Sequence, residues 1–226
     1  MAFFVDGPGG TGKTFLYHAL LASLRSDGHI AIATATSSIA ATLLPDGRTT
    51  HSRFKIPLIP EASSTCSISK KSNLAELIRR AVVFIWDEAH MVNRCALEAL
   101  DRTLQDLMKV NSHFGGKVLI LGGDFRQVLL VVPKGTKVEL LNARIVNSPL
   151  WRYIKILHLT QNMRFINNQQ FSKYIRRIGD GIEPFARDDP IKVSSSMAIP
   201  WEGDHSITQL IEQVFLDLQN HAYNAR

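Results

Sequence analysis

Short runs of apolar residues alternate along this chain with longer segments in which apolar residues recur every three or four positions. Apolar runs of this length, bounded by polar and turn-forming residues, are typical of buried strands, and the longer period is typical of helices. Strands that alternate with helices predict an α/β fold, a parallel sheet flanked by helices, with ligands bound at the carboxyl ends of the strands. The predicted strands are Ala2–Val5, Ile30–Ala35, Val82–Trp86, Lys117–Leu121 and Ile154–Leu159.

Helices are predicted in four segments. The first spans Lys13–Arg25, and a short one spans Ser37–Leu44, before a turn-forming sequence. Asn93 is a predicted N-cap for the third, and Ser206 with Gln209 three residues later predicts the start of a fourth through a capping box. The apolar residues of the first helix are expected to share its buried face: Phe15, Leu16, Ala19, Leu20 and Leu24.

The segment from Pro57 to Asn73 fits neither pattern. It is rich in proline, serine and threonine and ends near two lysines, Lys70 and Lys71, which predicts a mobile loop or a small inserted subdomain. We therefore expect one α/β lobe over residues 1–165, with an insertion at about 57–73, and a C-terminal extension over residues 166–226.

Eight residues after the first predicted strand match the phosphate-binding pattern G-x-x-x-x-G-K-[ST]. Glycines let successive backbone N–H groups turn inward, and the helix that follows adds the positive end of its dipole. The alternative is a glycine-rich turn that binds nothing. We predict a nucleoside triphosphate site in which Lys13 reaches the outer phosphates and the Thr14 hydroxyl ligates Mg²⁺. The predicted cradle is Gly7, Pro8, Gly9, Gly10, Thr11, Gly12, Lys13 and Thr14.

Two acidic residues directly follow the third predicted strand. An acid at the end of a strand beside the phosphate loop can hold Mg²⁺, and the next acid can deprotonate an attacking water. Asp87 is expected to take the first role and Glu88 the second; a solvated acidic strand end is the alternative. His90 gives a weaker signal, either as a sensor of nucleotide or as a residue that closes the loop.

A third polar motif, G-G-D-F-R-Q, follows the fourth predicted strand. In isolation this sequence would be equally consistent with a tight turn. Because it follows a third strand end, the amide of Gln127 is predicted to contact the γ-phosphate or its attacking water and to sense the loss of that phosphate.

Composition narrows the class of protein further. Of the 226 residues 45% are hydrophobic and 20% are charged, which is typical of a folded domain, and the net charge of +6 suits a polyanionic partner. Cys66 and Cys95 lack a paired metal-binding spacing, which argues against a zinc site or a disulfide scaffold and for a reducing compartment. No apolar stretch approaches the ~18 residues of a membrane span, and no targeting peptide is visible, so an intracellular protein is expected.

The motifs together resemble one family. G-P-G-G-T-G-K-T from Gly7, I-W-D-E-A-H-M around Asp87 and L-G-G-D-F-R-Q-V-L around Gln127 are similar to the Pif-type DNA helicases, of the RecD/Pif branch of superfamily one. The stretch from Ser37 to Pro57 and the sequence L-T-Q-N-M-R, which ends at Arg164, strengthen the likeness, so that it covers nearly the whole chain.

The resemblance implies a RecA-like motor lobe that uses ATP and Mg²⁺ to move along single-stranded DNA and unwind duplexes with 5′→3′ polarity. It implies that Arg164 reaches the γ-phosphate and completes a catalytic set with Lys13, Asp87, Glu88 and Gln127. It also implies that the insertion is a strand-separating wedge, whose two lysines either touch DNA or are solvated. Roles in DNA repair, recombination and telomere maintenance, in the nucleus or the mitochondrion, follow from the family alone.

The family binds single-stranded DNA through the segment that begins at Ser37. Here Ser37 and Ser38 offer N–H and hydroxyl donors to a phosphate, and Thr50 and His51 add polar contacts. Phe54 is predicted to be a stacking platform for a base. The alternative is a polar loop in which Phe54 packs in the core.

Two departures from the family are visible. Leu130 stands where the family has a proline, so the loop after Gln127 is expected to be looser. No second motor lobe follows, so we expect the chain to be incomplete and to need a second lobe, in a longer parent protein or in trans. Two alternatives are a truncated, transposon-derived fragment that binds ATP or DNA without catalysis, and a P-loop NTPase that does not act on DNA.

Overall fold

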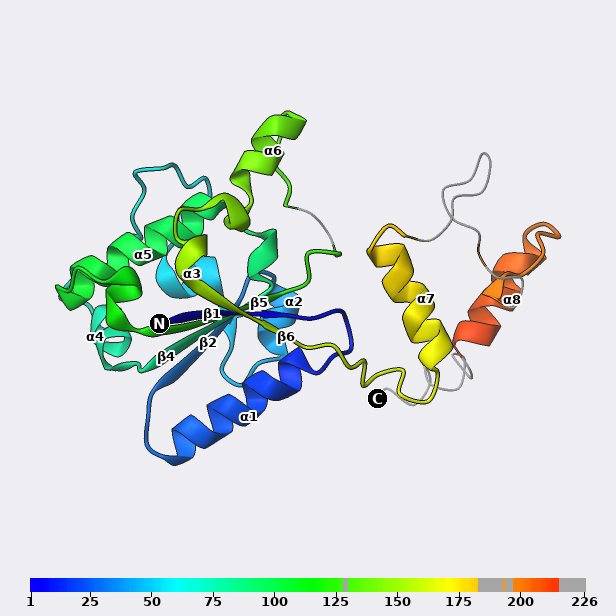
Figure 1. The fold of residues 1–226 in the computed structure, drawn as a ribbon, viewed down its shortest axis with the longest axis horizontal. Helices are drawn as coiled ribbons and strands as arrows, with labels where there is room; N and C mark the ends of the chain where they lie inside the picture. Colours follow the sequence, from blue (N-terminus) through cyan, green and yellow to red (C-terminus); the bar gives the residue numbers. More distant parts are fainter. Residues whose placement is uncertain (128–129, 183–192, 194–196, 216–226) are drawn as a thin grey trace. The chain divides into compact units, whose positions relative to one another are not determined.

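A computed structural model describes residues 1–127, 130–182, 193 and 197–215. The chain divides into two units, Met1–Gly179 and Asp180–Arg226. The first contains a six-stranded sheet in the order β3-β2-β4-β5-β1-β6, in which every pairing is parallel (Figure 1). The strands are β1 (Ala2–Asp6), β2 (Ala31–Ala35), β3 (Arg48–Thr49), β4 (Val83–Asp87), β5 (Val118–Gly123) and β6 (Ile154–His158).

The strand order places three functional loops at one edge of the sheet. β5 pairs with both β1 and β4, so that Asp6 is opposite Gly123 and Trp86 is opposite Leu121. Parallel strands end at the same edge, so the segments that follow β1, β4 and β5 begin side by side. The predicted α/β fold is therefore confirmed, and the three motifs lie at the carboxyl ends of the strands.

Helices cover both faces of the sheet. Phe84 and Trp86 of β4 pack in one core cluster together with α5, and Val83 and Ile85 pack in the other together with α1. Figure 1 shows α1 and α5 on opposite sides of the strands. Burial on both faces explains why β4 is an uninterrupted apolar run. The helices of the first unit are α1 (Lys13–Ser26), α2 (Ser38–Thr42), α3 (Thr50–Phe54), α4 (Asn73–Arg80), α5 (Arg94–Met108), α6 (Lys137–Ala143) and α7 (Gln169–Gly179).

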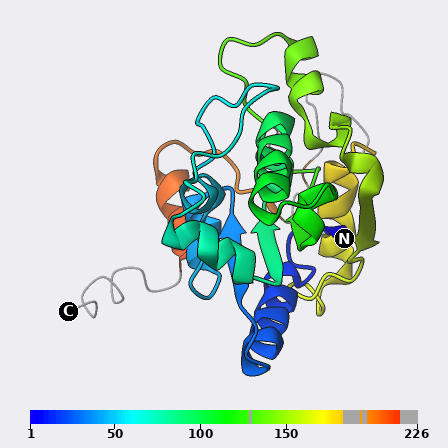
Figure 2. The ribbon, with the colours of Figure 1, turned by 90° about the vertical axis from the view of Figure 1, so that its left-hand side faces the viewer.

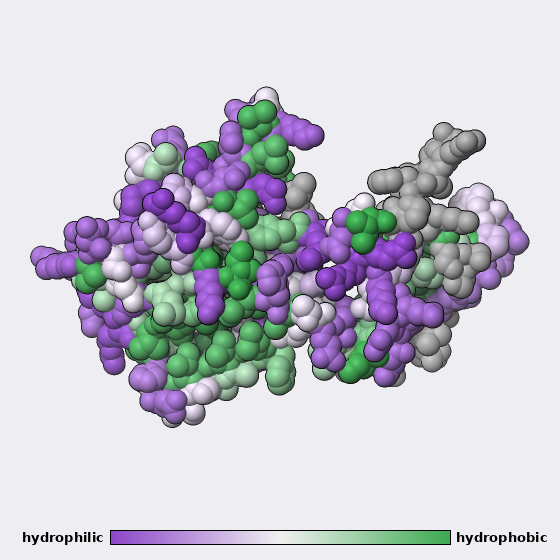
Figure 3. All heavy atoms as spheres, viewed as in Figure 1, coloured by the Kyte–Doolittle hydropathy of each residue, from purple (hydrophilic) through white to green (hydrophobic). Residues whose placement is uncertain are grey.

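The edge strand β6 is less covered. After Ile154, which is buried, its residues are exposed, including Ile156 and Leu157. Figure 3 shows apolar residues gathered over this side of the first unit, near α1. None of the described helices has both the length and the apolar character that crossing a bilayer requires.

The buried face of the first helix agrees only in part with the predicted one: Leu16 and Leu24 pack against the core as expected. Phe15 is 80% exposed and Ala19 is also exposed, whereas Tyr17 and Leu21 are fully buried. Tyr17 and Leu21 are four residues apart and therefore share a face, which packs against the sheet. The prediction counted only aliphatic residues and phenylalanine, and so it missed the tyrosine that anchors the helix.

The insertion is tied to α5 along its length. The Cys66 N–H donates to the Thr103 hydroxyl (2.8 Å), and Lys70 forms an ion pair with Asp106 (2.6 Å). Arg102 donates to the carbonyl of Ser64, and Figures 1 and 2 show the loop lying alongside α5. Residues 57–72 contain no helix or strand, as predicted for a loop, but Cys66 belongs to the hydrophobic core.

The second unit contains α8 (His205–Val214). The helix begins close to the predicted position, but the capping box is not formed. Asp204 is the N-cap residue, and the Ser206 hydroxyl instead donates to the carbonyl of Pro200 (3.1 Å) and accepts from the Glu202 N–H (2.7 Å). The serine therefore fixes the turn that precedes the helix.

Gly122, at the end of β5, provides a test of this packing. A methyl group on Gly122 would lie 1.7 Å from the Tyr17 hydroxyl oxygen, and the fully buried Tyr17 has no room to move. We expect Gly122→Ala to lower the free energy of unfolding by about 1–3 kcal/mol or more, measured by urea denaturation. Gly179→Ala is the control, because its nearest neighbours are Arg126 side-chain atoms at 3.4 Å. Equal unfolding midpoints for Gly122→Ala and the unmodified chain would contradict this account.

Candidate nucleotide and DNA site

The predicted phosphate loop connects β1 to α1 and has the backbone that its glycines allow. Gly10 and Gly12 both have φ of +87°, in the region that L side chains rarely adopt. A methyl group on Gly10 would also lie 2.8 Å from Cβ of Arg164 and 2.9 Å from Oδ1 of Asn162. Glycine is therefore required at Gly10 both by conformation and by the close approach of the segment around Arg164.

A cavity of about 560 Å³ lies beside this loop. It brings together all five residues of the predicted catalytic set, although they come from four different loops. Its lining comprises Gly9, Gly10, Gly12, Lys13, Thr14, Ala40, Leu43, Asp87, Glu88, His90, Gly123, Asp124, Gln127, Met163 and Arg164.

Lys13 carries a positive charge into this cavity. Its ammonium donates hydrogen bonds to the carbonyls of Gly7 and Pro8 within its own loop. Burial lowers the pKa of Lys13, and nearby carboxylates, with Asp124 and Asp87 the strongest, act in the opposite direction.

Asp87 lies at the end of β4 and is almost fully buried. Burial raises the pKa of its carboxyl group, while the Glu88 N–H, which donates to Oδ1 (2.9 Å), and the charge of Lys13 lower it. Asp87 and the Thr14 hydroxyl line one cavity and are both oxygen ligands of the kind Mg²⁺ prefers. Among the described residues no group of three or more histidine, cysteine or acidic side chains is placed to hold a metal ion.

Glu88 has an unusual backbone. Its φ of 55° and ψ of 32° are left-handed, which is uncommon for a residue other than glycine. Two side chains hold it in place. Thr36 donates to the Glu88 carbonyl (2.7 Å), and Ser37 donates to the carboxylate oxygen Oε2 (2.7 Å).

His90 lies beneath the cavity and is buried. Its Nδ1 accepts from the Asp124 N–H (3.4 Å), so the proton of the neutral ring is on Nε2. Burial lowers the pKa of His90, which favours that neutral ring. Within the described part of the chain Nε2 has no hydrogen-bond partner, so a buried donor is left at the edge of the cavity.

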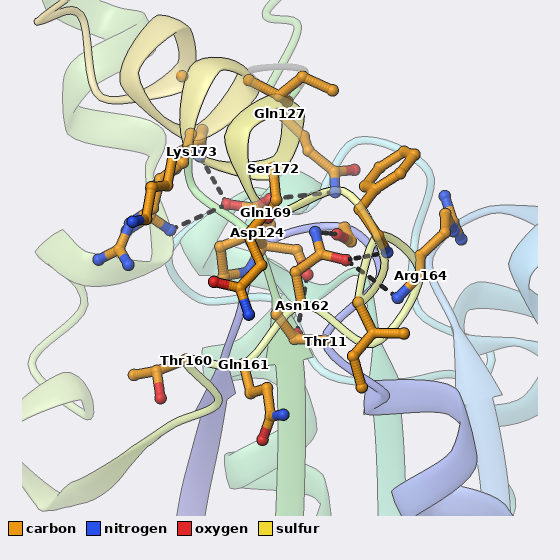
Figure 4. Close-up of a pocket in the computed structure, with 18 residues that line it drawn as sticks. Thr11, Asp124, Gln127, Thr160, Gln161, Asn162, Arg164, Gln169, Ser172 and Lys173 are labelled. Carbon is orange, nitrogen blue, oxygen red and sulfur yellow. Dashed lines mark hydrogen bonds and ion pairs between the residues drawn. The ribbon is translucent and has the colours of Figure 1, made fainter.

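Asp124 organises the loop that contains Gln127. Its carboxylate accepts from the Arg126 N–H (3.1 Å), from Arg126 Nη1 (3.3 Å) and from Gln127 Nε2 (3.2 Å), as Figure 4 shows for Gln127. The sequence prediction did not assign a role to Asp124. Leu130, expected to loosen this loop, is buried, and residues 128 and 129 lie outside the described residues.

Asn162 is a second residue without a predicted role. Its side-chain amide donates to the carbonyl of Gly9 (3.1 Å), and its Oδ1 accepts from the N–H groups of Arg164 and Phe165 (Figure 4). The Met163 N–H donates to the carbonyl of Gly10 (2.8 Å). Asn162 therefore fastens the segment that carries Arg164 onto the phosphate loop. An asparagine that bonds the backbone two residues ahead is typical of a turn, which is the signal that sequence reasoning missed.

A second cavity of about 560 Å³ is lined by Pro8, Gly9 and Thr11 of the phosphate loop (Figure 4). It shares Gly9, Asp124, Gln127 and Arg164 with the first. Its far wall is α7, which contributes Gln169, Ser172, Lys173, Ile175, Arg176 and Gly179.

The structure corrects two of the five predicted DNA contacts. Phe54 has no exposed surface and packs edge-on against Phe84, with ring centroids 5.5 Å apart, so it is not a stacking platform. Thr50 is also buried, and its hydroxyl donates to the carbonyl of Ala35 (3.1 Å). Thr50 and Phe54 are four residues apart on the single turn of α3, so both face the core.

The other three predicted contacts lie where a ligand can reach them. Ser38 is exposed, and Ser37 and His51 are half-buried. Burial lowers the pKa of His51, which favours its neutral form. Ser37 is also the N-cap of α2, because its side chain accepts from the Ala40 N–H (3.1 Å).

A comparison with protein families shows which family the chain belongs to. The model of the family described as PIF1-like helicase matches residues 1–189. The chain belongs to the PIF1-like helicase family. The predicted resemblance is thus confirmed, whereas the roles of individual site residues stay predictions.

Relatives share both sequence and fold with the chain. The ATP-dependent DNA helicase Pif1 of Campylobacter jejuni is 30% identical over 73% of the chain. The solved structure of Bacteroides Pif1 bound to single-stranded DNA is 26% identical, with a TM-score of 0.67 over 80% of the chain. A Bacteroides Pif1 complex with ADP-AlF4 is 26% identical, with a TM-score of 0.64 over 78% of the chain. The chain spans 39% to 43% of the length of these proteins.

The burial of Phe54 gives a prediction that separates core packing from base stacking. We expect Phe54→Ala to lower the free energy of unfolding by about 3–5 kcal/mol, because it removes a fully buried ring. Phe54→Leu keeps an apolar core side chain but no aromatic face. Its affinity for a fluorescent oligothymidine, measured by anisotropy, is expected to equal that of the unmodified chain. A Phe54→Leu variant of unchanged stability that binds the oligonucleotide more weakly would support stacking instead.

Proposed function

We propose that this chain is the first motor lobe of an ATP-dependent DNA helicase. In this proposal the lobe couples ATP hydrolysis to 5′→3′ movement along single-stranded DNA and to unwinding of duplexes. The observation that carries the proposal is the single cavity lined by Lys13, Thr14, Asp87, Glu88, Gln127 and Arg164. Membership of the PIF1-like helicase family supports it.

The proposed chemistry is in-line attack of water on the γ-phosphate of ATP. The backbone N–H groups of the phosphate loop and the Lys13 ammonium hold the phosphates, and for this Lys13 exchanges the carbonyls of Gly7 and Pro8 for phosphate oxygens. Thr14 and Asp87 hold Mg²⁺, which when bound neutralises charge on the phosphates.

Three side chains then act on the reacting atoms. Glu88 accepts the proton of the attacking water, and Arg164 stabilises charge on the transferred group. Gln127 senses the γ-phosphate by exchanging its bond to Asp124 for a contact with phosphate or water. Because Asp124 holds both Gln127 and Arg126, a change at Gln127 is passed to Arg126 in the same loop, whose side chain lies next to Gly179 of α7.

Single-stranded DNA is the proposed track, with Ser37, Ser38 and His51 as contacts. Arg48 and Lys55 are exposed beside these residues and supply positive charge for phosphates. The related Bacteroides Pif1, whose structure was solved with single-stranded DNA bound, supports this assignment. A second motor lobe, in the same parent protein or in trans, completes the proposed motor. Roles in repair, recombination and telomere maintenance, and a nuclear or mitochondrial location, stay predictions from the family.

The nucleotide part of the proposal rests on Lys13. We expect Lys13→Ala to weaken binding of a fluorescent ADP or ATP analogue on the order of 10- to 100-fold, because charge-assisted hydrogen bonds to phosphate contribute about 1.5–3 kcal/mol. Lys71→Ala removes an exposed lysine from the insertion and is the control. Unchanged nucleotide affinity in Lys13→Ala would refute the phosphate-loop assignment.

The catalytic part rests on Glu88. With Mg²⁺ and saturating single-stranded DNA, Glu88→Gln is expected to bind ATP normally but to release phosphate about 10²- to 10⁴-fold more slowly, because the amide cannot take a proton from water. Phosphate release by Glu88→Gln at the unmodified rate would refute this role. An unmodified chain that binds nucleotide without turnover would show that the second lobe is needed for hydrolysis.

A further inference from the structure

The proposed catalytic base is fastened to the first residues of the proposed DNA-binding segment. Ser37 Oγ lies 2.7 Å from Oε2 of Glu88, and Thr36 Oγ1 lies 2.7 Å from the Glu88 carbonyl. The Thr36 N–H also donates to the carbonyl of Asp87 (3.0 Å), and Thr36 itself accepts from the indole of Trp86 (3.0 Å). The strand end that carries the base and the start of the DNA segment therefore form one hydrogen-bonded unit.

The Ser37 hydroxyl has no spare proton. A serine hydroxyl donates one hydrogen bond, and in this structure that proton goes to the Glu88 carboxylate. Its oxygen accepts from the Ala40 N–H, which keeps the side chain at the start of α2. Ser37 therefore cannot donate to a DNA phosphate while it donates to Glu88.

Glu88 is also held in a conformation that its surroundings impose. Its left-handed backbone persists only where neighbouring groups over-determine it, and here Thr36 and Ser37 bind both its carbonyl and its carboxylate. Glu88 lines the nucleotide cavity, yet its carboxylate oxygen Oε2 is engaged by Ser37. While this bond is made, Ser37 sets the position of the carboxylate group in the cavity.

We propose that Ser37 is a positioning residue that restrains Glu88 when DNA is absent. A phosphate of single-stranded DNA takes the Ser37 proton, and the Glu88 carboxylate is released to act on water in the nucleotide cavity. The inference rests on the proposed function, because it takes the segment from Ser37 as a DNA contact and Glu88 as the base. Linkage then requires that whatever frees Ser37 from Glu88 also strengthens DNA binding.

This linkage can be measured by binding alone, without catalysis. We would measure the affinity of the full chain for a fluorescent oligothymidine in four proteins: unmodified, Glu88→Ala, Ser37→Ala and the double variant. Glu88→Ala frees the Ser37 hydroxyl and is expected to tighten DNA binding when Ser37 is present. This gain in affinity is expected to be larger, on the order of 5-fold or more, than the change that Glu88→Ala causes in the Ser37→Ala background. The loss of one negative charge at Glu88 is the same with and without Ser37, and the loss of the helix cap at Ser37 is the same with and without Glu88, so both effects cancel in the cycle.

Two further variants and one further measurement test this interpretation. Ser37→Thr retains the hydroxyl and is expected to restore the gain from Glu88→Ala. Ser72 is the N-cap of α4, and its side chain accepts from the Ala75 N–H (3.1 Å). Ser72→Ala therefore removes a comparable cap, and it is expected to leave the gain from Glu88→Ala unchanged. In a chain that turns over ATP, Ser37→Ala is expected to raise the rate without DNA and to reduce the stimulation by DNA.

The outcomes separate the two proposals. Equal effects of Glu88→Ala in the presence of Ser37 and in the Ser37→Ala background would overturn the role of Ser37 while leaving DNA binding itself intact. Absence of oligonucleotide binding in all four proteins would overturn the proposed DNA function and the role of Ser37 together. A gain that requires the Ser37 hydroxyl supports the restraint.

Discussion

Parallel pairing of β5 with both β1 and β4 is the constraint on which the rest of the site depends. It places the loops that follow Asp6, Asp87 and Gly123 side by side, and so sets several carboxylates around one ammonium. Such a cluster is costly to bury, and it is tolerated because the apolar faces of the strands are covered by α1 on one side and by α4 and α5 on the other. The apolar core supplies the rigid frame in which polar groups can be held at unfavourable positions.

Within that frame, each loop at the sheet edge satisfies the polar groups of its neighbour. Asn162 donates to the carbonyl of Gly9, the Asp124 N–H donates to Nδ1 of His90, and Ser37 donates to Glu88. Buried polar groups need partners, so in the absence of ligand the loops serve as partners for each other. A ligand that enters the cavity must exchange these bonds for its own, and each exchange changes the neighbouring loop. Coupling between loops is therefore a consequence of hydrogen-bond satisfaction and needs no additional element.

The motifs and the sheet could be predicted from sequence because their signals are local. The spacing from Gly7 to Thr14 encodes a loop whose backbone only glycine permits, and the run before Asp87 encodes a strand buried on both faces. The environments of Phe54 and Thr50 could not be predicted, because a helix of one turn is oriented by tertiary packing and not by its own pattern. The residues alone left an exposed and a buried Phe54 equally open, and the resemblance to the family favoured a DNA contact. The four-residue spacing of these two inward side chains was too short to reveal the buried face.

Asn162 and Ser206 illustrate the same limit at the level of single hydrogen bonds. Each has a side chain that can bond several nearby backbone groups, and sequence spacing does not choose among them. Asn162 bonds to the phosphate loop, which is far away in sequence. Ser206 bonds to residues that precede its helix and not to residues within the helix. Such choices depend on which backbone groups the fold leaves unsatisfied, which only the structure specifies.

The charges around the cavity bear on what it can accept. Lys13 and Arg164 face three acidic side chains, Asp87, Glu88 and Asp124, and burial lowers the pKa of His90. Side chains alone therefore do not offer a triphosphate a positive environment. In the proposed function, the attraction comes from the backbone N–H groups of the phosphate loop, from the dipole of α1 and from a divalent cation held by Asp87 and Thr14. The proposal therefore favours a metal–nucleotide complex over the free nucleotide as the ligand, because the acidic residues that repel the nucleotide alone attract the cation.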